Sequence, residues 1–300
     1  MSFVDDRKWY FSLLVMLACG LTLSCTEPEL IPLQAAVSGD DASGVGLIER
    51  MFRVRVDETV STEIYLPLGP DGSPLASPAP LVLSLHGGLV SPGQYQWLNV
   101  HMASRGFVVI APEHALDLAI FEQGNTLDVV GALRRASARS EDPLYGLIDE
   151  GPALAIGHSL GGVVASRAWL DAPEEITHLV LLSSLPNPSD NVGSRIDDNA
   201  FVLSLTGAED GRITVDEVIE GAAEFQAPTT VAVVEGMNHF QLVDAATSSQ
   251  WESDGPATIS TLEARRLVLE MVDEALKSLE SGEDDFFQEP SRWPEGVRHE

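Results

Sequence analysis

The stretch "LAIGHSLGGVVA", from Leu154 to Ala165, decides the fold prediction. An apolar run leads into the pentapeptide Gly157–Gly161 (GHSLG), and a second apolar run with helical character follows it. A serine between two glycines at this point is either a tight turn without chemistry or a G-x-S-x-G elbow. In such an elbow the glycines leave room for a sharp turn, and the hydroxyl of Ser159 projects from the backbone. The pentapeptide alone is weak evidence, so the choice depends on the rest of the chain.

Short, continuous apolar runs recur along the chain from residue 81 onward. Strands that are buried on both faces have this pattern, which favours a parallel sheet covered by helices. Stretches with helical character alternate with these runs and indicate βαβ units. The sequence therefore predicts an α/β domain with a mostly parallel, doubly wound sheet. The predicted strands are 81–88, 107–114, 153–159, 178–185, 200–207 and 229–236, and the predicted helices are 94–104, 126–140, 160–170, 215–225 and 260–279.

Two segments before the parallel part have a different pattern. Residues 51–57 ("MFRVRVD") and 61–68 ("STEIYLPL") alternate between apolar and polar side chains, as half-exposed strands do. A short polar turn separates them, which predicts antiparallel N-terminal strands. At the other end of the domain, Ser260 and Glu263 have the spacing of a capping box at the start of the last helix.

The N-terminus has the pattern of an export signal. The basic pair Arg7–Lys8 precedes an apolar run that ends in small residues, so we predict a secretory signal peptide over 1–24. Cys25 is the favoured lipidation site, because polar residues follow it as a tether, and Cys19 is the alternative. A plain signal peptide or an uncleaved anchor stays open. The expected location is a lipid anchor on the bacterial cell envelope, or otherwise the periplasm or the extracellular space.

Composition predicts three regions in the remaining chain and excludes one class of binding partner. A linker rich in Pro, Gly, Ser and Asp is expected over 25–46, the α/β domain over 47–279, and an acidic tail without structure over 280–300. With 46 acidic and 17 basic residues the net charge is −29, which excludes a nucleic-acid partner. The two cysteines both lie near the N-terminus, and no metal-binding histidine spacing occurs, so we expect neither a metal nor a cofactor.

Chemically useful residues follow the ends of several predicted strands, where an open parallel sheet binds its ligands. Gly87 and Gly88 follow the first of these strands, and their backbone N–H groups can approach an oxyanion. Glu209 and Asp210 follow the fifth strand and offer a carboxylate to orient a histidine. His239 follows the last strand. A serine at the elbow needs such a base and carboxylate to become nucleophilic.

These segments resemble the α/β-hydrolase superfamily over nearly all of 48–279, and most closely a compact bacterial branch. The nucleophile, acid and histidine also occur in the chain order of that fold. One departure is Met237, where a second glycine would be usual. The matching segments are HGG (86–88), GHSLGG (157–162), G-x-x-DG (207–211), G-x-NH-x-Q (236–241) and DG-x-AT (254–258).

The resemblance implies that Ser159 is the nucleophile, Asp210 the acid and His239 the general base. Gly211 after Asp210 matches the branch, which favours Asp210 over Glu209. The N–H groups of Leu160 and of Gly88 or Leu89 would form the oxyanion hole.

The expected activity is that of a carboxylesterase-like serine hydrolase, which cleaves a small-molecule ester or thioester through an acyl-enzyme. Only 186–199 occupies the usual place of a lid, so a minimal lid is expected. Two other interpretations stay open: a hydrolase-fold protein that binds a ligand without turnover, and an acyltransferase that uses the same triad. His158 is expected to pack beside the elbow, and Tyr95–Trp97 is a candidate pocket wall.

Overall fold

The computed structural model describes residues 30–33, 44–55, 58–75, 77–113, 123–186, 201–225 and 229–300. The predicted signal peptide, both cysteines and residues 187–199 of the predicted minimal lid lie outside these ranges. The statements below concern the described part of the chain.

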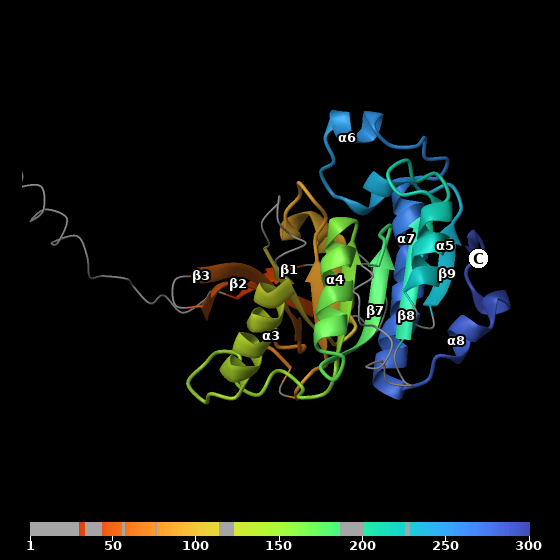
Figure 1. The fold of residues 1–300 in the computed structure, drawn as a ribbon. Coiled ribbons are helices and arrows are strands. Elements are labelled where there is room, and N and C mark those ends of the chain that lie inside the picture. Colours follow the sequence, from red (N-terminus) through yellow and green to blue (C-terminus); the bar gives the residue numbers. More distant parts are fainter. Residues whose placement is uncertain are drawn as a thin grey trace, which may run out of the picture.

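One mixed sheet forms the centre of the molecule (Figure 1). In the described ranges its strand order is β1-β2-β3-β5-β4-β6-β7-β8-β9-β10, and the six strands from β5 to β9 in this order are parallel. All six coincide with predicted apolar runs and are buried along most of their length. The fold prediction is therefore confirmed. The six strands are β4 (Leu81–Leu85), β5 (Val108–Pro112), β6 (Ala153–His158), β7 (Ile176–Leu182), β8 (Phe201–Gly207) and β9 (Thr229–Val234).

Antiparallel strands extend the sheet on both sides. As predicted, β2 (Gly44–Arg55) and β3 (Glu58–Leu68) form an antiparallel pair, and β3 joins the parallel strands through β5. The linker prediction for 25–46 is wrong in part. Residues 31–33 form β1 (Ile31–Leu33), which pairs with the start of β2, because a backbone edge was available there for ladder hydrogen bonds.

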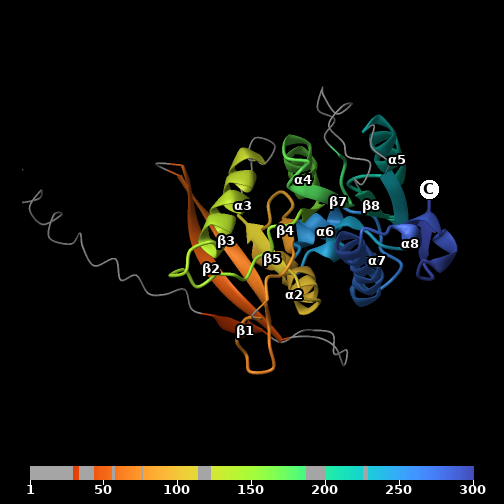
Figure 2. The ribbon, with the colours of Figure 1, turned by 90° about the horizontal axis from the view of Figure 1, so that it is seen from below.

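Helices cover both faces of the sheet, as Figure 2 shows. Buried side chains of α3 (Gln123–Ser137) and α4 (Leu160–Asp171) pack on one face, where α5 (Val215–Glu224) also lies. Side chains of α2 (Gln96–Ser104) and α7 (Thr261–Ser281) pack on the other. None of the helices described is long and apolar enough to cross a membrane.

The start of α7 differs in one detail from the predicted capping box. The Ser260 hydroxyl accepts a hydrogen bond from the amide of Glu263, at 3.2 Å, as predicted. The Glu263 carboxylate does not return to Ser260 but pairs with Arg266, at 2.7 Å. An arginine three residues further along the helix thus competes successfully for this carboxylate.

The prediction of an acidic tail without structure over 280–300 is wrong. This segment forms α8 (Asp285–Gln288), a 3-10 turn η5 (Pro290–Arg292) and β10 (Val297–His299), which pairs antiparallel with β9. Phe287 and Trp293 are buried in the same cluster as α7, and the Trp293 indole donates to the Phe286 carbonyl at 3.1 Å. Burial of these aromatic rings and ladder hydrogen bonds outweigh the acidic composition.

Candidate active site

The elbow after β6 holds its serine in a strained conformation. Ser159 has φ 53° and ψ −125°, and α4 starts at the next residue. A Cβ on Gly157 would lie 2.3 Å from the carbonyl oxygen of Gly161, and one on Gly161 would lie 2.2 Å from that of Leu85. The close backbone approach therefore requires glycine at both positions. Ser159 is held at the tip of the turn between β6 and α4.

The loop after β4 lies beside the elbow, because β4 and β6 are neighbours and the chain reverses its strand order between them. Such a switch point is where open α/β sheets bind ligands. An ideal Cβ on Gly88 would lie 3.4 Å from the Leu160 side chain, so this loop touches the first turn of α4. In the described ranges, the amides of Gly88, Leu89 and Leu160 donate no hydrogen bond. They remain available to an oxyanion near Ser159.

The ends of β8 and β9 bring a carboxylate and an imidazole together. Asp210 follows β8, and His239 opens the 3-10 turn η4 (His239–Leu242) after β9. His239 Nδ1 lies 2.9 Å from Asp210 Oδ2, and their side chains are 4% and 0% exposed. The other Asp210 oxygen accepts the amides of Arg212 and Ile213, both at 2.8 Å. A carboxylate oxygen accepts this hydrogen bond, so Nδ1 is the donor and the lone pair of the imidazole is on Nε2.

A second carboxylate joins the two loops that carry this pair. Asp254 Oδ1 accepts the amide of Gly211, and its Oδ2 accepts the amide of Phe240, each at 2.9 Å. A Cβ on Gly211 would lie 2.3 Å from the nitrogen of Gly255, so the backbones approach closely here. The segment 254–258 is one of the motifs that carry the resemblance. It thus holds the Asp210 loop against the His239 loop.

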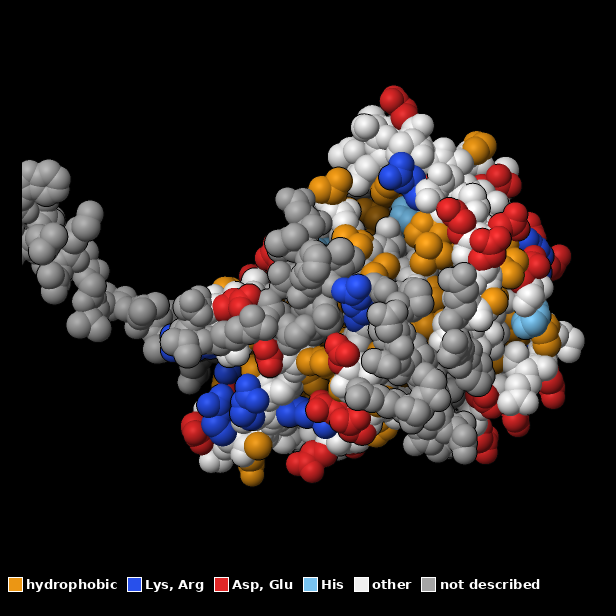
Figure 3. Space-filling model, viewed as in Figure 1, with side chains coloured by type: hydrophobic (Ala, Val, Ile, Leu, Met, Phe, Trp, Pro, Cys, Tyr) orange, Lys and Arg blue, Asp and Glu red, His pale blue; other side chains and the backbone are white. Residues whose placement is uncertain are grey.

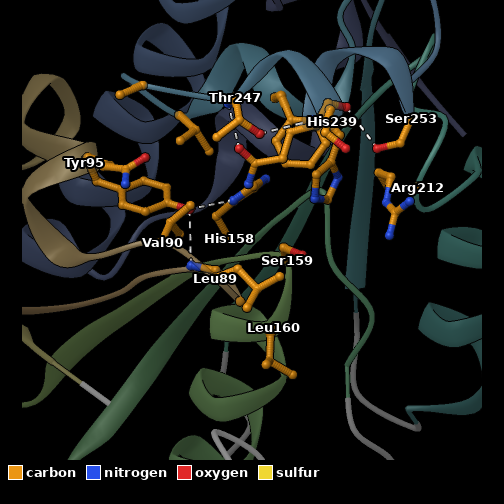
Figure 4. Close-up of a pocket in the computed structure, with 18 of the residues that line it drawn as sticks. Leu89, Val90, Tyr95, His158, Ser159, Leu160, Arg212, His239, Thr247 and Ser253 are labelled. Atoms are coloured by element: carbon orange, nitrogen blue, oxygen red, sulfur yellow. Dashed lines mark hydrogen bonds between the residues drawn. The ribbon is translucent and has the colours of Figure 1, made fainter. Parts of the chain in front are cut away.

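A buried hydrogen-bond chain lies under the elbow. The Gly87 amide donates to the Tyr95 hydroxyl at 3.0 Å, and this hydroxyl is hydrogen-bonded to His158 Nδ1 at 2.7 Å (Figure 4). Burial, and secondarily the neighbouring charge of His239, lower the pKa of His158 well below its ordinary value. The ring centroids of the two histidines are 4.5 Å apart. His158 is therefore neutral and packs beside the elbow, and its Nδ1 is already occupied.

A pocket of about 670 Å³ opens above these residues. Ser159, His239 and Tyr95 line it, and hydrophobic and histidine side chains show within a hollow just below the α6 region (Figure 3). One part of its wall is apolar and another is polar. The apolar part contains Leu89, Val90, Leu160, Ile213, Phe240 and Val243, and the polar part contains Gln94, Thr247, Ser249, Gln250 and Ser253.

Apart from Gln94, the polar wall comes from a segment that the sequence prediction missed. Helix α6 (Ser248–Glu252) follows η4 in the chain and lies above the upper ends of the strands in Figure 1. Ser249 and Gln250 of this helix line the pocket. Thr247 and Gln250 form a capping box at its start, with the Thr247 amide 2.7 Å from the Gln250 side-chain oxygen. The T-x-x-Q spacing was the available signal, but five residues have too little apolar periodicity to reveal a helix.

The predicted pocket wall at Tyr95–Trp97 is correct only for Tyr95. Trp97 turns away, because its indole donates to the Leu242 carbonyl at 3.1 Å and the guanidinium of Arg265 stacks 4.7 Å above its ring. Tyr95 itself ends the 3-10 turn η1 (Pro92–Tyr95), which leads directly into α2. Its hydroxyl faces the pocket floor (Figure 4).

Within the part of the chain that the structure describes, neither Glu209 nor the Ser159 hydroxyl is bonded to His239. Among the described residues, Glu209 forms no hydrogen bond or ion pair with His239, so Asp210 alone is placed to orient the imidazole. The Ser159 hydroxyl makes no hydrogen bond to His239 in this part of the chain; such contacts commonly tighten only with substrate. Within the same ranges, no group of three or more His, Cys, Asp or Glu residues could hold a metal ion.

The sequence also matches the model of a known protein family. The model of the alpha/beta hydrolase family matches residues 81–266. The chain therefore belongs to the α/β-hydrolase family, as the motifs indicated, and a hydrolase-type function follows in general terms. No curated protein is similar enough to the chain to count as a relative.

Proposed function

We propose that the protein is a serine hydrolase that cleaves a small carboxylic ester or thioester through an acyl-enzyme on Ser159. The observation that carries the proposal is the buried pair of His239 and Asp210, 2.9 Å apart, whose histidine lines the same pocket as a serine on a strained elbow. A structural turn needs neither the strain nor a buried acid–base pair beside it.

In this mechanism His239 Nε2 takes the proton of Ser159 as the hydroxyl attacks the substrate carbonyl. Asp210 keeps the imidazole in the required tautomer and stabilises the imidazolium that forms. The amides of Leu160 and of Gly88 or Leu89 bind the oxyanion, and each such donor contributes about 2.7–4 kcal/mol to lowering the barrier. His239 then returns the proton to the leaving alcohol, and water activated by the same base cleaves the acyl-enzyme.

The proposal is tested with a fluorophosphonate probe on the purified protein and on a Ser159→Ala variant. We expect covalent labelling at Ser159, mapped by mass spectrometry, and its loss in the variant. Ser140→Ala is the matched control, because Ser140 is exposed and does not line the pocket. Absence of labelling in a protein shown to be folded by circular dichroism would contradict the proposal and favour a ligand-binding role.

Hydrolysis and acyl transfer use the same residues, and product analysis separates them. We expect p-nitrophenyl esters to give free acid as the main product when short alcohols or amines are added. A dominant transfer product would instead identify an acyltransferase.

We also propose export and lipid attachment, with Cys25 as the modified residue. The support is the sequence pattern of residues 1–25, which lie outside the described ranges. Expression with a labelled fatty acid tests this. Label should enter the full-length protein and Cys19→Ala but not Cys25→Ala; the reverse pattern would assign the modification to Cys19.

A further inference from the structure

Arg212 is an isolated cation in the wall of the pocket. It lies two residues after Asp210, and its side chain stands beside His239 (Figure 4). Its backbone amide is bound to Asp210, but in the described ranges its guanidinium has no carboxylate or hydrogen-bond partner. Most arginines elsewhere on the molecule are paired with carboxylates. Those in ion pairs are Arg50, Arg105, Arg139, Arg265, Arg266, Arg292 and Arg298.

The rest of the described pocket wall leaves the guanidinium of Arg212 available to a negatively charged ligand. None of the described lining residues is an aspartate or glutamate, although the chain has 46 acidic residues. Two carboxylates near it already accept hydrogen bonds, Asp210 from His239 and two amides, and Asp254 from the amides of Gly211 and Phe240. Arg212 is the one Lys or Arg side chain among the described lining residues, so a negatively charged group of a ligand would meet a cation on this wall.

We propose, on the basis of the serine-hydrolase function above, that the substrate is an ester carrying a carboxylate, and that Arg212 binds this group. A guanidinium presents two parallel N–H donors that match the two oxygens of a carboxylate. The apolar wall accommodates the carbon chain between the carboxylate and the scissile carbonyl at Ser159. Half-esters of dicarboxylic acids have this combination of groups.

The test compares esters that differ only by the charge. Mono-p-nitrophenyl adipate and p-nitrophenyl hexanoate have acyl chains of equal length, and glutarate and suberate half-esters with their neutral counterparts vary the reach. A second pair, 3-acetoxybenzoate and 3-acetoxybenzamide, places the charge on the leaving group instead. The readout is the ratio of kcat/KM for the charged ester to that for its neutral partner.

We expect the ratio to exceed one for at least one pair and to fall by about 10–100-fold in Arg212→Gln, as loss of a hydrogen bond to a charged group predicts. The loss should appear mainly in KM. Arg212→Lys should retain part of the preference, since it keeps the charge but not the fork. Arg135→Gln, on the exposed side of α3, removes one positive charge away from the pocket and should leave the ratio unchanged.

The two proposals fail in distinguishable ways. If neutral esters are hydrolysed in a Ser159-dependent manner but no pair shows a ratio that depends on Arg212, the substrate inference is wrong and the hydrolase function stands. If neither ester type is hydrolysed and Ser159 is not labelled, the hydrolase function is wrong and the inference falls with it.

Discussion

Tyr95 and His158 are joined by a 2.7 Å hydrogen bond that links the turn η1 to the end of β6, directly under the elbow. The same hydroxyl accepts a hydrogen bond from the amide of Gly87. One side chain therefore connects the loop that carries Gly87 and Gly88, the elbow and the start of α2.

The first prediction concerns this link. Tyr95→Phe leaves the buried Gly87 amide and His158 Nδ1 without their partner, which should lower the free energy of unfolding by about 1–3 kcal/mol. Ester kcat should fall by about tenfold or more, because the loop that carries Gly88 and Leu89 loses its support. Urea unfolding and steady-state kinetics measure the two effects. Tyr145→Phe, at an exposed tyrosine, is the control, and equal stability of both variants would contradict the prediction.

The second prediction separates two adjacent carboxylates. Asp210→Asn should lower kcat by about 10⁴-fold, because an amide no longer holds His239 in the reactive tautomer. Glu209→Gln removes the same charge one residue earlier and should remain close to the unmodified protein, since Glu209 forms no hydrogen bond or ion pair with His239 among the described residues. Hydrolysis of a p-nitrophenyl ester measures both. Comparable losses in the two variants would show that the charge of this loop matters rather than the contact.

The third prediction concerns Asp254, which acts through other residues. In Asp254→Asn one oxygen is replaced by an NH₂ group that faces the amide of Gly211 or Phe240. We expect kcat to fall by about 10–100-fold with little change in KM, because the Asp210 and His239 loops shift relative to each other. Asp171→Asn, on the exposed end of α4, is the control. A changed KM with unchanged kcat would instead place Asp254 in substrate binding.

The fourth prediction is a pH dependence of stability. Burial lowers the pKa of His178 from 6.5 to about 4. The unfolded chain therefore binds more protons than the folded one between these values, so the stability contribution is complete above pH 6.5 and is lost as the pH falls toward 4. The loss amounts to about 3 kcal/mol for a shift of this size.

Urea unfolding between pH 7.5 and pH 4 tests this fourth prediction. The unmodified protein should lose about 3 kcal/mol more than His178→Gln over this range. His299→Gln changes an exposed histidine and should follow the unmodified protein. Parallel curves for all three proteins would show that protonation of His178 does not destabilise the fold.

The sequence predicted the parallel sheet well, because strands buried on both faces are continuous apolar runs and need no tertiary information. The elbow was equally visible, since steric demands at Gly157 and Gly161 leave a direct mark in the residue types. The positions of Asp210 and His239 after their strands also followed from the motifs. The choice of Asp210 over Glu209 as the partner of His239 came only from the resemblance, because it depends on how two loops fold over the sheet edge.

Short elements and long-range contacts were less predictable. Strand β10 has three residues, and its pairing with β9 depends on the place where the chain returns to the sheet edge. Helix α6 has only five residues, and Arg212 sits in a turn with no periodic pattern. The link between Tyr95 and His158 spans 63 positions in the chain, so no local spacing could indicate it.

The two edges of the sheet have a consequence for self-association. In the described ranges they are formed by β1 and β10, each of three residues and each antiparallel to its only neighbour. Long open edges recruit strands from other molecules, whereas very short ones offer few free backbone groups. Strand β1 pairs with residues 45–47 of β2, and β10 pairs with residues 232–234 of β9. Deletion of 297–299 would therefore expose this part of β9 to pairing with strands of other molecules.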